Sequence, residues 1–252
     1  MATEGFDHSM FGPGPARDDR FVVKDQWVEC ANFPEGDPAK KFEFLHRQMN
    51  EEMNVMENAA RSLADFPDAE WELRMWLARQ CSDEARHVIA YRRLFESHGG
   101  HVGQYPVLNF QYKILGSITT LIGRLAVQNR TFEADGLDAA TRAHEEAKAE
   151  GDEPLAAMLD AQQADEVLHI RFANEFIRRT VTATPRAALH MASALTLASR
   201  AFAQVWAHGG THVTKYGVAE EHRLAAGFAP EEVRFAVEQS AARREAVERA
   251  GA

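Results

Sequence analysis

Two segments of the chain place an Asp-Glu pair three and four residues before a histidine, SDEARH at 82–87 and ADEVLH at 164–169. Residues three apart on an α-helix share a face, so a glutamate and a histidine at this spacing can converge on one metal ion. By itself the Glu-x-x-His pattern is weak, because a chain with 11 histidines contains roughly one match by chance. This chain contains three, at Glu43–His46, Glu84–His87 and Glu166–His169.

The apolar periodicity of the flanking residues separates these three matches. Glu84–His87 and Glu166–His169 each continue an apolar stripe, at positions where packing would otherwise place Leu or Val, so both pairs are predicted to point into the core. Glu43–His46 lies off the stripe of its own segment and lacks the preceding aspartate. It is therefore predicted to be a solvated pair with no metal.

Two further acids lie within apolar stripes. Glu52 belongs to the row that runs from Leu45 to Leu63, and Glu133 to the row that ends at Gly136. Glu84 follows Glu52 by 32 residues and Glu166 follows Glu133 by 33, so the chain contains two helix pairs with the same arrangement of acids and histidine.

Two neighbouring acids, Glu51 and Glu57, are alternatives to Glu52. The stripe disfavours both, because a shift of one residue turns a side chain by about 100° around the helix.

Four carboxylates turned into a core would cost several kcal/mol each unless positive charge lies among them. A dinuclear metal centre supplies that charge. Carboxylate oxygens with one imidazole per ion suit iron or manganese better than structural zinc. The predicted ligands are Glu52 and Glu133 as terminal or bridging carboxylates, Glu84 and Glu166 as bridges, and His87 and His169 as the nitrogen ligands.

Several nearby side chains have two interpretations each. Asn129 and Gln162, one turn before Glu133 and Glu166, either line a substrate pocket or satisfy the buried ligands. Cys81 is interpreted as a buried thiol, with a redox role as the alternative. Tyr91 is interpreted as a core tyrosine, with electron transfer as the alternative.

Three later histidines also bear on the metal hypothesis. His190, on the inward face of its predicted helix, is a candidate third imidazole ligand. His208 and His212 are predicted to lie in a loop, because the two glycines between them would break a helix that aligned them.

Helix-start signals at Asp37-Pro38, Asp68, Asp152 and Thr184-Pro185 and the absence of alternating strand patterns predict an all-α fold. The predicted helices are 38–65, 69–97, 108–149, 153–182, 185–207 and 230–250. The predicted organisation is an arm or lid at 1–36, a four-helix di-metal bundle at 37–182, and accessory C-terminal helices at 183–252 packing on the bundle.

Composition restricts the function classes. A net charge of -10 disfavours nucleic acid as a partner. Two cysteines form no disulfide framework and suit a reducing compartment. The N-terminal residues lack a secretory pattern, and the most apolar segment carries polar residues, so a cytoplasmic protein without membrane spans is expected.

The six ligand positions resemble the ferritin-like di-iron carboxylate superfamily, which includes bacterioferritin, rubrerythrin, the ribonucleotide reductase small subunit and the bacterial multicomponent monooxygenases. The resemblance covers about residues 40–180 and implies a ferritin-like four-helix bundle. It also implies that Asp83 and Asp165 orient the ligand histidine of the other helix. SDEARH is similar to the form found in di-iron monooxygenases. The segments EADGLDAA, GDEPLAAML and ADEVLH are most similar to an uncharacterised ferritin-like group, which implies no single activity.

These observations predict a di-iron oxidase or oxygenase that uses dioxygen to hydroxylate, desaturate or N-oxygenate a small organic molecule. Two iron ions are the expected cofactor, with Fe/Mn or Mn as alternatives, and an external electron donor is expected. The chain would act as a monomer or homodimer. The alternatives are a ferroxidase or iron-handling protein, and a metal-free helical interaction module.

Overall fold

The computed structural model describes residues 6–34, 36–206 and 217–251, and helices dominate them. The strands among these residues are two short segments, β1 (Val23–Lys24) and β2 (Val107–Leu108). They pair in parallel, with Val23 opposite Val107 and Lys24 opposite Leu108. The predicted all-α class is confirmed. No helix in this part of the chain combines the length and the apolar character that a bilayer span requires.

Most of the described helices follow one another with short connections, but a longer one that contains β2 joins α2 to α3. Two of the helices are 3-10 turns, η1 (His8–Met10) and η2 (Trp27–Glu29), and one is a π-helical turn, η3 (Gln128–Phe132). The α-helices are α1 (Pro38–Asp65), α2 (Trp71–Ser97), α3 (Phe110–Gly116), α4 (Leu121–Val127), α5 (Glu133–Glu150), α6 (Glu153–Ala183), α7 (Ala187–Trp206), α8 (Glu220–Ala225) and α9 (Pro230–Gly251).

The predicted helix-start signals have mixed outcomes. Asp37 caps α1 by accepting from the Ala39 N–H, and Asp152 caps α6 by accepting from the Leu155 N–H, as predicted. The prediction for Asp68 was wrong, because Glu70 is the residue that precedes the first turn of α2. Thr184 instead ends α6.

The prediction of one continuous helix over 108–149 was also wrong. The chain leaves the helical path between Gly116 and Thr120, and the π turn η3 follows α4. Gly116, the last residue of α3, packs against Arg61, and a Cβ there would lie 2.7 Å from Arg61 Nη1. The buried side chain of Arg124 donates to the Ile118 carbonyl at 3.0 Å, which satisfies a backbone group that the break leaves without a helical partner.

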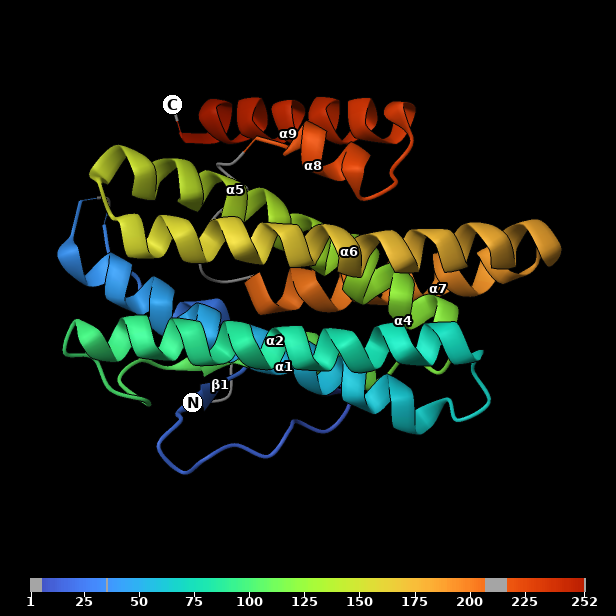
Figure 1. Cartoon of the computed structure of the whole chain (residues 1–252), viewed down its shortest axis with the longest axis horizontal. Helices are drawn as coiled ribbons and strands as arrows, with labels where there is room; N and C mark the ends of the chain where they lie inside the picture. Colours follow the sequence, from blue (N-terminus) through green and yellow to red (C-terminus); the bar gives the residue numbers. More distant parts are fainter. Residues whose placement is uncertain (1–5, 35, 207–216, 252) are drawn as a thin grey trace. The chain divides into compact units, whose positions relative to one another are not determined.

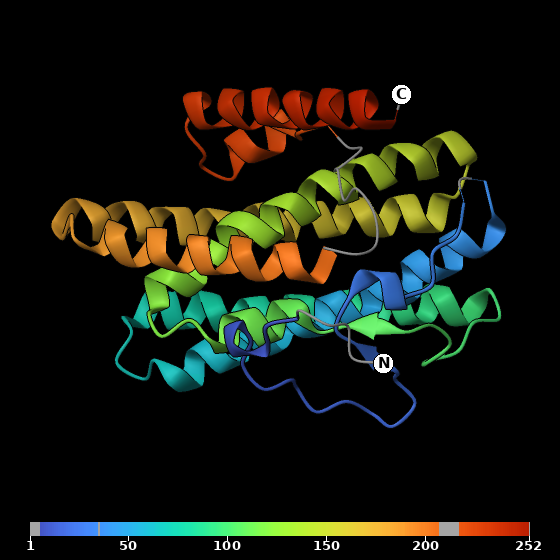
Figure 2. The same ribbon diagram turned by 180° about the vertical axis from the view of Figure 1, so that it is seen from behind.

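The chain divides into two compact units. Unit 1 comprises Met1–Gln128 and Arg186–Gly210, and unit 2 comprises Asn129–Pro185 and Thr211–Ala252. In unit 1, α1 and α2 lie side by side over most of their length, and α7 packs against α4 (Figure 1, Figure 2). In unit 2, α5 and α6 form the corresponding long pair (Figure 1). Each unit thus contains one of the two helix pairs that the repeat predicts.

The segment before α1 contains no α-helix among its described residues. Arg17, whose side chain is 4% exposed, donates to both carboxylate oxygens of Glu57 at 2.7 and 2.8 Å and to Asn50 at 3.1 Å. The indole rings of Trp27 and Trp206 lie 4.5 Å apart. This segment is therefore held to α1 and α7 by buried polar and aromatic contacts. Its action as a lid stays a prediction.

Helix α8, which lies outside the predicted helices, is joined to α5 by a buried arginine. Arg223 donates to Asp138 at 2.6 and 3.0 Å and to the Ala134 carbonyl at 3.2 Å. The Ala219 N–H also donates to Asp138. Beneath these contacts lies an apolar cluster formed by Ala134, Leu137, Val167, Ile170 and Ala226.

We expect Arg223→Met to destabilise unit 2 by about 3 kcal/mol, because it leaves the half-buried Asp138 carboxylate without its cation. Urea unfolding followed by hydrogen exchange should show early loss of amide protection over 219–228. Arg178→Met is the matched control, since Arg178 is exposed and donates to the Gly227 carbonyl. An equal decrease in the free energy of unfolding in the two variants would contradict the assignment of Arg223 as the residue that holds α8 to α5.

Candidate metal centre

The first half-site lies in unit 1 and consists of Glu52 from α1 with Glu84 and His87 from α2. His87 Nδ1 lies 2.9 Å from Glu84 Oε2 and 3.3 Å from Glu52 Oε2. One ligand atom from each residue lies within 4.8 Å of the others. All three are buried, and Glu84 is 0% exposed. The prediction that these side chains point into the interior is confirmed.

The second half-site lies in unit 2 and consists of Glu133 from α5 with Glu166 and His169 from α6. His169 Nδ1 lies 3.3 Å from Glu166 Oε2 and 3.8 Å from Glu133 Oε2. Their ligand atoms also lie within 4.8 Å of one another, and all three residues are buried. The two units therefore build the same group of side chains from the same helical spacing.

One residue of the predicted Glu133 stripe lies on a different face of α5. Gly136, the predicted end of the Glu133 stripe, is exposed, and Leu137 and Ala140 are buried instead. A π turn inserts an extra residue into the helix and rotates everything that follows it. The turn η3 immediately precedes Glu133 and so rotates the whole of α5 relative to α4. Within α5 the buried positions follow Glu133 by four and seven residues, whereas the prediction took the position three residues on.

The first half-site attracts positive charge. Burial would lower the pKa of His87, but hydrogen bonds and attraction from Glu52 and Glu84 outweigh burial and raise its pKa to about 12. A buried imidazole flanked by two carboxylates is thus held as a cation. The same pair of carboxylates is suited to a divalent ion.

Two glutamines contact the half-sites at equivalent positions. Gln162 Nε2 donates to Glu166 Oε1 at 3.3 Å, and Gln80 Nε2 lies 3.5 Å from Glu84 Oε1. Asn129 donates to the His169 carbonyl at 3.2 Å. The interpretation of Asn129 and Gln162 as partners of the buried ligands is therefore confirmed. Gln80 is a residue that sequence reasoning missed, although the pattern Gln-x-x-Asp-Glu-x-x-His occurs at both 80–87 and 162–169.

The other acids near the half-sites have cationic partners of their own. Glu51 accepts from Arg47, and Glu57 accepts from Arg17, so each alternative to Glu52 has an arginine beside it. Asp83 is buried and accepts from Arg79 and Arg86, while Asp165 is half-buried. The orienting role of Asp83 and Asp165 stays a prediction.

The prediction that Glu43–His46 is solvated was wrong. Glu43 is 7% exposed and His46 is 0% exposed. The connection between α2 and α3 folds back over this face of α1, and the Gly103 N–H donates to His46 Nε2 at 2.9 Å. Gly103 has a φ of +88°, and a Cβ there would lie 2.1 Å from the Arg20 carbonyl, so glycine is required at this contact.

His46 should give the fold a distinct pH dependence. Burial, with repulsion from His101, lowers the pKa of His46 from 6.5 to about 4. Between these values the unfolded chain holds a proton on this side chain and the folded protein does not. The free energy of unfolding should therefore decrease as pH falls through this window, by up to about 3 kcal/mol.

Urea unfolding at several pH values would measure this effect, and His46→Phe should lose that part of the pH dependence. His98→Phe is the control, because His98 is exposed. An unchanged pH dependence in His46→Phe would contradict the assignment.

The remaining candidates differ in outcome. The hypothesis of His190 as a third imidazole was wrong, because His190 is exposed near the solvent-facing first turns of α7, where Leu189 is also exposed. His208 and His212 lie outside the described residues.

Cys81 is half-buried, where a buried thiol was expected, and its Sγ lies 3.6 Å from the Met56 carbonyl oxygen. Tyr91 is buried and contacts the Phe44 ring, as expected for a core tyrosine.

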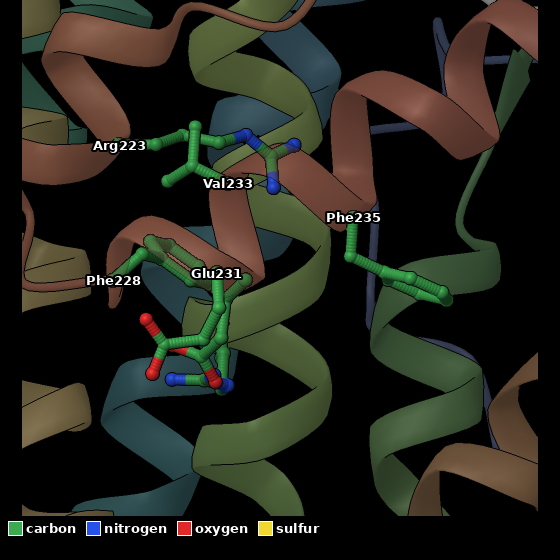
Figure 3. A pocket seen from close by; sticks show the side chains of 7 residues that line it. Arg223, Phe228, Glu231, Val233 and Phe235 are labelled. Atoms are coloured by element: carbon green, nitrogen blue, oxygen red, sulfur yellow. The ribbon is translucent and has the colours of Figure 1, made fainter.

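Unit 2 also contains an open pocket of about 360 Å³, shown in Figure 3. Phe228 forms its floor between two guanidinium groups, with Arg130 at 4.7 Å and Arg223 at 5.5 Å from the ring centre. Both arginines also pair with carboxylates, Arg130 with Glu232 and Arg223 with Asp138. None of the predicted ligands lines this pocket.

The described residues thus define an all-helical protein with two buried carboxylate–histidine groups that can hold metal. A family model described as "Protein of unknown function (DUF455)" matches residues 6–234. The chain belongs to this family. No curated protein and no solved structure matched it.

Proposed function

We propose that this protein is a non-haem di-iron oxidoreductase of the ferritin-like class, which uses dioxygen to oxidise a small organic molecule. The observation that carries the proposal is the duplicated half-site: two buried glutamates and one buried histidine within 4.8 Å of one another, at the same spacing in both units. In this proposal the two half-sites act together and each contributes the ligands of one ion.

The donor chemistry fits iron or manganese. Each half-site offers two carboxylates and one imidazole and no thiolate, a set that suits Fe or Mn. Two carboxylate charges are balanced by one divalent ion, so binding removes the cost of burying them. The raised pKa of His87 supports this view, since Glu52 and Glu84 together favour a positive charge beside them.

Two bound iron ions would supply the reduction of dioxygen and the oxidation of the substrate. The chain's own residues bind and orient the ions through the six ligands. Burial of Glu84 and His169, each 0% exposed, limits access of bulk water. The helix pairs hold the ligands on rigid elements, so each half-site is preorganised for its ion. In this proposal the substrate is a small organic molecule and an external donor supplies the electrons. The protein acts in the cytoplasm as a monomer or a homodimer.

We expect the protein to bind two Mn²⁺ or Fe²⁺ ions per chain. His87→Ala and His169→Ala should each weaken the binding of one ion by at least about 100-fold, because an imidazole ligand is lost from a buried acidic group. Equilibrium dialysis with elemental analysis measures the stoichiometry. His190→Ala, an exposed histidine, is the matched control and should keep both ions.

Electron paramagnetic resonance of the Mn²⁺-loaded protein tests whether the half-sites act together. Adjacent ions give a spin-coupled spectrum, whereas separate ions give the signal of isolated Mn²⁺. Less than one ion per chain with intact ligands would favour the metal-free interaction module and contradict the proposal.

The Fe²⁺-loaded protein should consume dioxygen, and a substrate should change the rate at which the oxidised intermediate decays. Stopped-flow absorption with panels of small organic metabolites measures this rate, and mass spectrometry identifies an oxidised product. Oxygen consumption that only deposits ferric iron in a large shell, seen by size-exclusion chromatography, would favour the ferroxidase instead.

A further inference from the structure

The two carboxylates of the Glu-x-x-His motifs are contacted on both oxygens in the same way. Glu84 Oε2 lies 2.9 Å from His87 Nδ1, and Glu84 Oε1 lies 3.5 Å from Gln80 Nε2. Glu166 Oε2 lies 3.3 Å from His169 Nδ1, and Glu166 Oε1 accepts from Gln162 Nε2 at 3.3 Å. Each carboxylate therefore has one oxygen toward an amide and the other toward an imidazole.

We propose that Gln80 and Gln162 are positioning residues that hold the Glu84 and Glu166 carboxylates with Oε2 turned toward the histidine ligand. This inference rests on the proposed function, because it concerns how the two half-sites present their oxygens to metal. The glutamines act through the carboxylates and are not ligands in the proposal.

The physical basis is the freedom of a glutamate side chain. The terminal torsion of glutamate is broad, so an unrestrained carboxylate presents either oxygen in a range of orientations. A hydrogen bond from an amide to one oxygen restricts that rotation, and hydrogen bonds to charged groups are among the stronger ones in proteins. Gln80 is 1% exposed and Gln162 is 6% exposed, so water competes little for either amide.

The hydrogen-bond donor to Oε1 of Glu84 and Glu166 is a neutral amide, which suits a site for a metal ion. Glutamine satisfies the second oxygen without adding charge, so the two carboxylates of each half-site still require a divalent ion. A lysine or arginine in the same position would balance one carboxylate and weaken the attraction for metal. Occupation of Oε1 by the amide N–H leaves Oε2 as the oxygen next to the imidazole nitrogen.

Gln163 shows that burial alone does not account for the arrangement. It follows Gln162 on α6 and is 3% exposed. Its amide donates to the Leu159 carbonyl, and its oxygen accepts from Thr141. A buried glutamine on the same helix thus serves packing and backbone contacts, and it provides a matched control for the two that contact ligand carboxylates.

The test compares Gln80→Met, Gln162→Met and Gln163→Met, which keep side-chain length and remove the donor. Mn²⁺ affinity is measured by titration with detection of free Mn²⁺ by paramagnetic resonance, and the melting temperature is measured without metal. We expect Gln80→Met and Gln162→Met each to lower the affinity for one Mn²⁺ ion about 10- to 100-fold. The Mn²⁺ affinity of Gln163→Met should stay within about 2-fold of that of the protein without substitutions. We expect this even if the melting temperature of Gln163→Met falls as much as those of the other two variants.

The outcomes separate the inference from the proposed function. An unchanged protein that binds no Mn²⁺ refutes the proposed metal centre, and the inference with it. If the protein without substitutions binds Mn²⁺, and Gln80→Met and Gln162→Met bind it with the same affinity, the positioning role alone is refuted. A loss of affinity in all three variants that follows their melting temperatures shows a structural role and also overturns the inference.

Discussion

The burial of two carboxylates beside one imidazole is the constraint on which the rest of this structure depends. A buried carboxylate costs several kcal/mol unless positive charge or hydrogen bonds compensate for it. In the first half-site His87 meets that demand, because hydrogen bonds and attraction from Glu52 and Glu84 raise its pKa to about 12 despite burial. A site that holds an imidazolium this firmly is one in which a divalent ion can replace the proton. Both half-sites could therefore hold a metal ion.

The acids of α1 show how this demand distinguishes a candidate ligand from a structural residue. Glu51 lies beside Arg47, Glu57 beside Arg17, and Glu52 beside His87. An arginine is always charged, so Glu51 and Glu57 have permanent partners. Histidine can give up its proton and coordinate metal through the same nitrogen. Three acids close together on one helix thus differ in the side chain that faces each one, and only Glu52 faces a residue that can also bind metal.

The irregular parts of the chain form specific hydrogen bonds with the long helices. The π turn η3 directly precedes Glu133, and Asn129 within it donates to the His169 carbonyl. The connection between α2 and α3 covers His46 through Gly103, and α8 is attached to α5 through Arg223. Each of these segments replaces solvent on a helix face with a specific hydrogen bond. The regular helices supply the candidate ligands, and the irregular segments cover parts of other helix faces.

The helical class and the inward direction of Glu52, Glu84, His87, Glu133, Glu166 and His169 could be predicted because they depend on local periodicity. Residues on one face of a helix share an environment, and an acid in an apolar row reveals its direction without knowledge of the fold. Asp37 and Asp152 were predictable for a similar reason, since a cap bonds to the turn beside it. The spacing of the two Glu-x-x-His motifs likewise depends only on the rise and turn of a helix.

Other features depend on what lies across from a residue, which periodicity does not contain. His46 is buried because a distant connection covers it, whereas His190 is exposed because no described element covers its end of α7. After the break that follows Gly116, the buried Arg124 donates to the Ile118 carbonyl, and a π turn precedes α5. Contacts between segments far apart in the chain decide these points, because burial and hydrogen-bond partners are properties of the assembled helices and not of any one of them.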